Sequence, residues 1–202
     1  MYTNLPNLLT YARILMVPAV VGAFYLEGDT ANWIALGIFI VAGITDFLDG
    51  YLARAWEQQS SLGRMLDPIA DKLLVAAVLL MLVSTGAIGG WSVWAAIVIL
   101  CREILVSGLR EFLASVRVSV PVTHLAKWKT AIQMIAIGFL LAGSAGDKIL
   151  PYTTEIGIGL LWMAAILTLY TGYDYFKAGI KHAMEDDEHP ASAAPRPTNI
   201  KP

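Results

Sequence analysis

The sequence predicts an all-α membrane protein with six transmembrane helices, and its composition, apolar segments and loop charges lead to this fold class. Of the 202 residues, 57% are hydrophobic and only 15% are charged, which is too apolar for an ordinary soluble domain. The formal net charge is −2, from 14 basic and 16 acidic residues, so the composition argues against nucleic acid as a partner. The chain is expected to lie in a lipid bilayer among membrane lipids.

Six apolar segments support this expectation, because a helix needs about 20 apolar residues to cross the hydrocarbon core. They cover approximately residues 7–26, 32–53, 66–88, 92–113, 124–142 and 157–176. The first ten residues contain no Lys or Arg, and no small-residue cleavage site follows the first segment. We therefore expect this segment to remain as a helix and not to be removed as a signal peptide.

The charges in the connecting segments predict the orientation. An even number of spans places both termini on one side, and that side has most of the basic loop residues, whereas the opposite loops have only Lys148. By the positive-inside rule both termini are cytoplasmic, as in a bacterial-type inner membrane. Residues 1–182 are expected to form one transmembrane domain, and the acidic and Pro/Ala-rich residues 183–202 a disordered tail.

The second apolar segment contains carboxylates that are costly at membrane depth, by about 3 kcal/mol each. Asp46 and Asp49 are three positions apart, and Gly50 and Ala53 follow them. At 100° per residue these four positions fall within an arc of about 100°. They therefore share one helical face, with small residues beside the acids.

The third segment has a matching stripe if its helix begins one turn before the apolar run. Gly63, Asp67 and Asp71 recur every four residues and cover an arc of about 80°. The short connection makes the two helices antiparallel neighbours, so the two acidic stripes are expected to meet near the cytoplasmic surface.

Four carboxylates in a low-dielectric site repel one another unless cations are present. We predict that Asp46, Asp49, Asp67 and Asp71 bind divalent metal. Oxygen ligands suit Mg²⁺ or Mn²⁺, and two such ions would hold a diphosphate and stabilise charge on the attacking and leaving oxygens.

Two alternatives use the same carboxylates. They could form structural ion pairs with Arg54, Arg64 and Lys72, although three bases against four acids leave a charge uncompensated. They could also line an ion or proton pathway. Neither alternative explains why small residues keep both faces open.

The complete spacing resembles the signature of the CDP-alcohol phosphatidyltransferases, with every position present. That signature is formed here by Asp46, Asp49, Gly50, Ala53, Arg54, Gly63, Asp67 and Asp71. Further stretches, including residues 4–10, 66–73, 102–104 and 127–130, are similar to the phosphatidylglycerophosphate-forming subgroup of that family. The resemblance implies a membrane enzyme that uses CDP-diacylglycerol as donor and glycerol 3-phosphate as acceptor.

The family's roles carry over to the matching positions of this chain. The resemblance implies that Asp46, Asp49 and Asp67 bind metal, and that Asp71 both contacts a metal and takes the proton from the acceptor hydroxyl. It also implies a binding site for CDP-diacylglycerol, with small residues close to the nucleotide and an arginine at its phosphates. That site comprises Gly50, Ala53, Arg54 and Gly63, with Thr45 either at a substrate or bonded to the backbone.

The acceptor is an anion and needs cationic side chains. Arg102 and Arg110 are eight residues apart, about 80° around a helix, so they can face one pocket and bind a phosphate through their guanidinium groups. Lys127 and Lys129 are about 200° apart, so at most one should point inward, and the resemblance favours Lys127. Each of these charges could instead be an interfacial charge or part of a structural ion pair.

Other assignments stay open at the level of the sequence. Arg13 either lies near the nucleotide or extends to the membrane interface. The acceptor could be inositol phosphate, serine or phosphatidylglycerol, as in sister transferases. A membrane prenyltransferase also binds metal and diphosphate through aspartates, but it usually needs more spans and a second aspartate-rich motif. The resemblance further implies a homodimer, which small residues in the outer helices permit.

Overall fold

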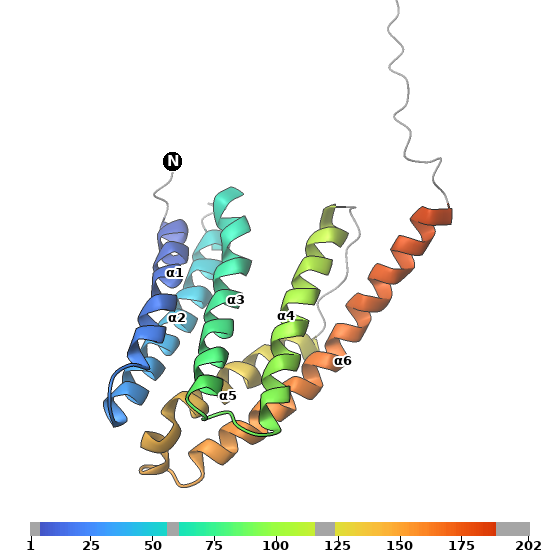
Figure 1. Cartoon of the computed structure of the whole chain (residues 1–202). Helices are drawn as coiled ribbons and strands as arrows, with labels where there is room; N and C mark the ends of the chain where they lie inside the picture. The colour runs from blue at the N-terminus through green and yellow to red at the C-terminus, as the bar shows by residue number, and fades with distance from the viewer. Residues whose placement is uncertain (1–4, 56–60, 116–123, 189–202) are drawn as a thin grey trace, which may run out of the picture.

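The computed structural model describes residues 5–55, 61–115 and 124–188, and all the regular structure in these ranges is helical. The predicted all-α class is confirmed. Each apolar segment expected from the sequence corresponds to one helix (Figure 1). In the described ranges the helices are α1 (Leu5–Ala23), α2 (Asp29–Ala55), α3 (Ser61–Ser84), α4 (Ser92–Ser115), α5 (His124–Asp147) and α6 (Thr153–Glu188).

Helices α1 to α4 run alternately up and down, and α5 and α6 lie obliquely to them (Figure 1). Helix α1 packs against both α2 and α3, and α6 packs against both α4 and α5. Within the described residues α2 and α3 make few close backbone contacts with each other. The neighbours that the short connection predicts are therefore joined mainly through α1 and α5, each of which contacts both.

Apolar side chains both fill the bundle and cover its outside. Leu79, Ile99 and Leu161 are fully buried, whereas the equally apolar Leu15 and Ile104 are 71% and 67% exposed. A helix that is apolar all round belongs either in a large core or in a membrane. Because these side chains cover the surface, the protein is an integral membrane protein.

Four helices in the described part of the chain are long and apolar enough to cross a membrane, which is fewer than the six spans expected. The four spans are Asp29–Leu48, Ser92–Ala114, Trp128–Asp147 and Thr153–Tyr173. Helix α1 has a shorter apolar stretch, Leu8–Ala23. Helix α3 differs for another reason. Its first three turns contain charged residues, among them Asp67 and Asp71, which together with Asp46 and Asp49 we name the acidic motif.

Helix α6 is longer than the sixth apolar segment, which ends near residue 176. It continues past residue 182 to Glu188, so the first residues of the expected tail are helical. Residues 189–202, the rest of that expected tail, lie outside the described residues.

Helix α5 is interrupted at Gly143, close to the predicted end of its apolar segment. Gly143 has φ 44° and ψ −133°, a conformation that side chains with a Cβ rarely adopt. Asn32 of α2 donates a hydrogen bond from Nδ2 to the carbonyl oxygen of Leu141 at 2.9 Å, just before the break. A Cβ atom at position 143 would lie 3.0 Å from Asn32 Nδ2, so both the backbone and the neighbouring helix require glycine.

Two polar contacts secure the same end of the bundle. Lys148 donates to both carboxylate oxygens of Asp29, at 2.7 and 2.6 Å, and this pair joins the start of α2 to the turn after α5. Asp147 accepts hydrogen bonds from the backbone nitrogen and the hydroxyl of Thr154. These bonds satisfy donors at the start of α6 that have no partner within the helix.

Replacing Gly143 by Ala should destabilise the fold, because the left-handed backbone costs about 1–2 kcal/mol for a residue with a Cβ. The midpoint of thermal unfolding in detergent should fall. Gly22→Ala is the control, because a Cβ there meets no heavy atom within 4 Å. Equal midpoints for the two variants would contradict the assigned role of Gly143.

Candidate active site

The residues predicted to form the site lie toward one end of the bundle, where α2 and α4 end and α3 begins (Figure 1). The structure describes the side chains of Thr45, Asp46, Asp71, Arg102 and Arg110. The other predicted residues lie in helical backbone, but their side chains fall outside the described part of the chain. These are Asp49, Gly50, Ala53, Arg54, Gly63, Asp67 and Lys127.

Asp46 forms an ion pair with Arg13 of α1, with Nη1 of Arg13 2.6 Å from Oδ1 of Asp46. The Arg13 side chain is 1% exposed, whereas that of Asp46 is 47% exposed. A buried guanidinium is costly unless it is paired, and Asp46 supplies the opposite charge. Arg13 therefore does not extend to the membrane interface but points into the bundle at the acidic motif.

Asp71 lines a small cavity of about 50 Å³ between α3, α4 and α5, which we name the carboxylate cavity. Lys72, Glu103 and Gln133 contribute further polar groups to its wall. Asp46 lies close enough for its carboxylate to repel that of Asp71. The structure thus brings together one acid from each of the two predicted stripes.

Glu103 of α4 and Lys129 of α5 form an ion pair at this cavity. Lys129 is 3% exposed, and Oε1 of Glu103 is also 3.6 Å from Nη1 of Arg102. Lys129 is thus a lysine that faces the bundle interior, although the resemblance favoured Lys127. The pair fixes one anion and one cation beside Asp71.

A second cavity of about 300 Å³, which we name the arginine cavity, lies between α3 and α4. Its lining includes three cationic residues, Lys72, Arg102 and Arg110, and two acidic ones, Glu103 and Glu111. Lys72 and Glu103 line both this cavity and the carboxylate cavity. The two cavities are therefore adjacent, with Asp71 on one side and Arg110 on the other.

Arg102 also connects α4 to α6. Its Nε donates to the carbonyl oxygen of Thr168 at 3.0 Å, and its Nη2 donates to Oγ1 of Thr171 at 3.0 Å. The guanidinium packs against Gly172, where an added Cβ would lie 3.3 Å from the Arg102 side chain. Much of the hydrogen-bonding capacity of Arg102 therefore serves helix packing, and Arg110 is the more exposed of the two arginines.

The hydroxyl of Thr45 donates to the carbonyl oxygen of Ala42 at 2.8 Å. The bond lies within α2, one turn before the residue itself, and is a common way for threonine to satisfy its hydroxyl in a helix. The sequence left Thr45 either at a substrate or bonded to backbone, and the structure has the backbone bond.

The described acids fit the donor set that the predicted metal ions require. Asp46 and Asp71 offer carboxylate oxygens, which Mg²⁺ and Mn²⁺ favour, and their mutual repulsion is the kind that a cation relieves. Among the described side chains no group of three or more acidic, histidine or cysteine residues gathers as a metal site. Asp49 and Asp67, the other two predicted ligands, lie outside those side chains.

Two residues of the site, Arg13 and Lys129, were not assigned a role from the sequence, although helical periodicity contained the signal. On α1, Thr10, Arg13 and Val20 are all buried and lie on one stripe with a spacing of three and seven residues. On α5, Lys129 and Gln133 continue the buried stripe that Ala136, Ile137 and Leu140 form. A charged residue in phase with a buried stripe is thus a marker of the site.

The model of the family described as CDP-alcohol phosphatidyltransferase matches residues 3–170. A Rickettsia bellii protein named CDP-diacylglycerol–glycerol-3-phosphate 3-phosphatidyltransferase is 50% identical over 179 residues, which cover 89% of this chain and 97% of that protein.

Two further relatives are less identical to this chain. A Cereibacter sphaeroides protein of the same name is 39% identical over 217 residues, covering 91% of this chain and 98% of that protein. A cardiolipin synthase (CMP-forming) of Oryza sativa is 41% identical over 188 residues, covering 86% of this chain and 56% of that protein. With the family model matching most of its length and relatives of this identity, the chain belongs to the CDP-alcohol phosphatidyltransferase family.

Proposed function

We propose that this enzyme transfers the phosphatidyl group of CDP-diacylglycerol to glycerol 3-phosphate, forming phosphatidylglycerophosphate and CMP. The observation that carries the proposal is that the arginine cavity adjoins the carboxylate cavity through Lys72 and Glu103. An acceptor with a phosphate at one end and a hydroxyl at the other fits such a pair of cavities. The names of the Rickettsia and Cereibacter relatives support the same donor and acceptor.

In this proposal Asp71 removes the proton from the acceptor hydroxyl. The oxygen then forms a bond to the phosphorus next to the diacylglycerol, and the bond from that phosphorus to the oxygen of CMP breaks. Asp71 is suited to this role because it lines a cavity that shares Lys72 and Glu103 with the arginine cavity. A positioned base of this kind contributes about 10²–10⁴-fold to the rate.

The donor would be held where the acidic motif lies. The resemblance places the nucleotide against Gly50, Ala53 and Gly63, with Arg54 at its phosphates. Mg²⁺ or Mn²⁺ at Asp46, Asp49, Asp67 and Asp71 would offset the charge that develops on the diphosphate. Arg13 would hold Asp46 in place while the donor enters. In their ion pair the arginine side chain is buried, whereas the carboxylate is half exposed.

The acceptor phosphate would lie in the arginine cavity. Arg110 offers a planar set of donors that matches phosphate oxygens, and Lys72 adds a second positive charge. Arg102 would act mainly by holding α4 against α6, since its donors bond to Thr168 and Thr171. Lys127 keeps its proposed place at the acceptor from the family resemblance.

The proposal includes six membrane spans with both termini in the cytoplasm, in a bacterial-type inner membrane. Helices α2, α4, α5 and α6 each contain a span that is long and apolar enough to cross a membrane. Helices α1 and α3 would be the other two spans, and both pack against these helices. The charged end of the bundle would face the cytoplasm, where glycerol 3-phosphate and CMP are soluble. We also propose a homodimer, as the family resemblance implies.

A second acceptor is favoured by one observation. The Oryza sativa relative is named a cardiolipin synthase, and phosphatidylglycerol, the acceptor of a sister transferase, is therefore the alternative acceptor to test. Because that lipid reaches the site from the membrane, it needs no cavity for a free phosphate monoester. The cationic lining of the arginine cavity favours glycerol 3-phosphate.

Purified enzyme supplied with CDP-diacylglycerol and each acceptor in turn should release CMP with glycerol 3-phosphate. Removing divalent ions with a chelator should stop CMP release, and adding back Mg²⁺ or Mn²⁺ should restore it. Release with phosphatidylglycerol, serine or inositol phosphate instead of glycerol 3-phosphate would overturn the proposed acceptor.

Asp71→Asn should lower kcat by about 10²–10⁴-fold, because it removes the base at nearly constant shape. Asp29→Asn is the matched control. It makes the same substitution at the start of α2, the end of that helix that lies away from the candidate active site. Both variants should bind CDP-diacylglycerol and keep their thermal midpoints within a few degrees of the parent enzyme. Normal turnover by Asp71→Asn would show that the base is another group.

Arg110→Ala should raise the KM for glycerol 3-phosphate by at least about tenfold, because a charge-assisted hydrogen bond is worth about 1.5–3 kcal/mol. The KM for CDP-diacylglycerol should change little. Lys148→Ala, which removes an exposed cation at the far end of the bundle, should leave both values unchanged. An unaltered acceptor KM in Arg110→Ala would place the phosphate elsewhere.

A further inference from the structure

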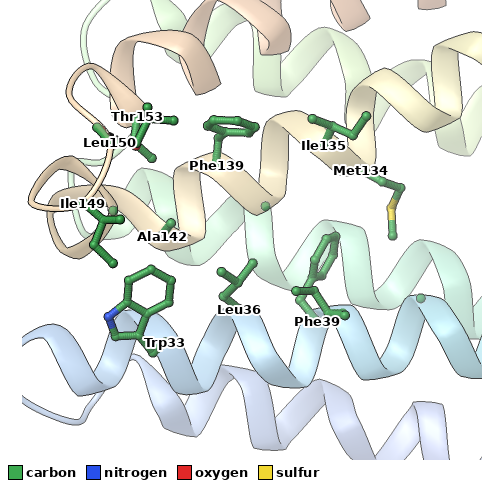
Figure 2. A pocket seen from close by; sticks show the side chains of 14 residues that line it. Trp33, Leu36, Phe39, Met134, Ile135, Phe139, Ala142, Ile149, Leu150 and Thr153 are labelled. Carbon is green, nitrogen blue, oxygen red and sulfur yellow. Dashed lines mark hydrogen bonds between the residues drawn. The ribbon is translucent and has the colours of Figure 1, made fainter.

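A groove of about 480 Å³ runs between α2 and α5 (Figure 2). Its walls are apolar, with Leu36 and Phe39 on α2 facing Phe139 and Ile135 on α5 (Figure 2). Gly138 leaves room in the middle of the groove, because a Cβ there would meet only Leu36, at 3.7 Å. The groove suits a narrow apolar ligand.

One end of the groove reaches the candidate active site. Met134 lines both the groove and the carboxylate cavity that contains Asp71. On the opposite wall, Gly43 lines the groove and is three residues, less than one helical turn, from Asp46. A ligand whose polar end lies between the two aspartates would therefore enter the groove past Met134, whose Cε lies 3.5 Å from the position of a Cβ on Gly43.

Large side chains border the other end of the groove. Trp33 on α2 lies opposite Ile149, in the turn after α5, with Leu150 next to it (Figure 2). The ten residues from Gly43 to Trp33 correspond to about 15 Å of helix. This is half the thickness of a hydrocarbon core of about 30 Å, the depth that an acyl chain of one leaflet covers.

We propose that this groove holds one acyl chain of the CDP-lipid donor and that Trp33, Ile149 and Leu150 limit the length of that chain. The inference rests on the proposed function for the identity of the donor. The Met134 wall that the groove shares with the carboxylate cavity argues for the donor's own chain and against an unrelated ligand, because the chain and the diphosphate belong to one molecule. The large side chains at the far end make the enzyme selective for chain length.

Gly138→Leu tests the proposal by filling the middle of the groove. With dihexanoyl, dilauroyl, dipalmitoyl and distearoyl donors at equal concentration, this variant should lose about tenfold or more in kcat/KM for the long chains. The dihexanoyl donor should be affected little. Trp33→Ala should have the opposite effect and raise the relative rate with the distearoyl donor.

Gly37→Leu is the matched control, because it places the same side chain on the same wall helix α2, where a Cβ meets nothing within 4 Å. Its chain-length profile should equal that of the parent enzyme. Equal loss for every donor in Gly138→Leu, or an unchanged profile in both groove variants, would overturn the proposal. A change of oligomeric state without a change of profile would instead assign the groove to an interface between copies.

Donor binding separates this inference from the proposed function. The rise in thermal midpoint on adding each donor measures binding without turnover. If the parent enzyme binds long-chain donors but releases no CMP with glycerol 3-phosphate, the proposed acceptor fails and the groove is still tested. If CMP release is normal and binding by Gly138→Leu does not depend on chain length, only the groove assignment fails.

Discussion

Charged groups inside a bundle whose outer surface is apolar are the constraint on which the rest of the structure depends. Each such group costs about 3 kcal/mol at membrane depth, and the bundle offsets this cost by pairing charges from different helices. Arg13 on α1 meets Asp46 on α2, and Lys129 on α5 meets Glu103 on α4. The polar interior therefore also joins the helices, because neither partner of a pair is stable there without the other.

The same constraint explains why α3 is not apolar enough to count as a span by itself. Its first turns contain the acids and bases of the site, and only its second half is continuously apolar. Ala70, Leu74 and Val78 turn to the core, while Asp71 and Lys72 face the cavities between α3, α4 and α5. Asp71 and Lys72 of α3 thus depend on the neighbouring helices for a polar environment.

The helices and the family could be predicted from the sequence, because apolar length and motif spacing are local properties. The pairing of Arg13 with Asp46 could not, because 33 positions separate them and nothing local shows which helix a buried arginine will meet. The bond from Arg102 to α6 was missed for the same reason. A preference for Lys127 over Lys129 came from resemblance, whereas the buried stripe on α5 contains Lys129.

The groove shares α5 with the carboxylate cavity and α2 with Asp46, and its two ends differ. At the far end, Asn32 bonds to the carbonyl of Leu141, and Asp29 pairs with Lys148, so polar contacts fix the separation of α2 and α5 beside Trp33. At the near end the contact between Gly43 and Met134 is apolar. Cε of Met134 lies 3.5 Å from the position that a Cβ on Gly43 would occupy. Apolar contact is not directional, so the near end can adjust to a bound headgroup while the far end keeps its width. A length limit set at the far end therefore does not depend on which headgroup occupies the site.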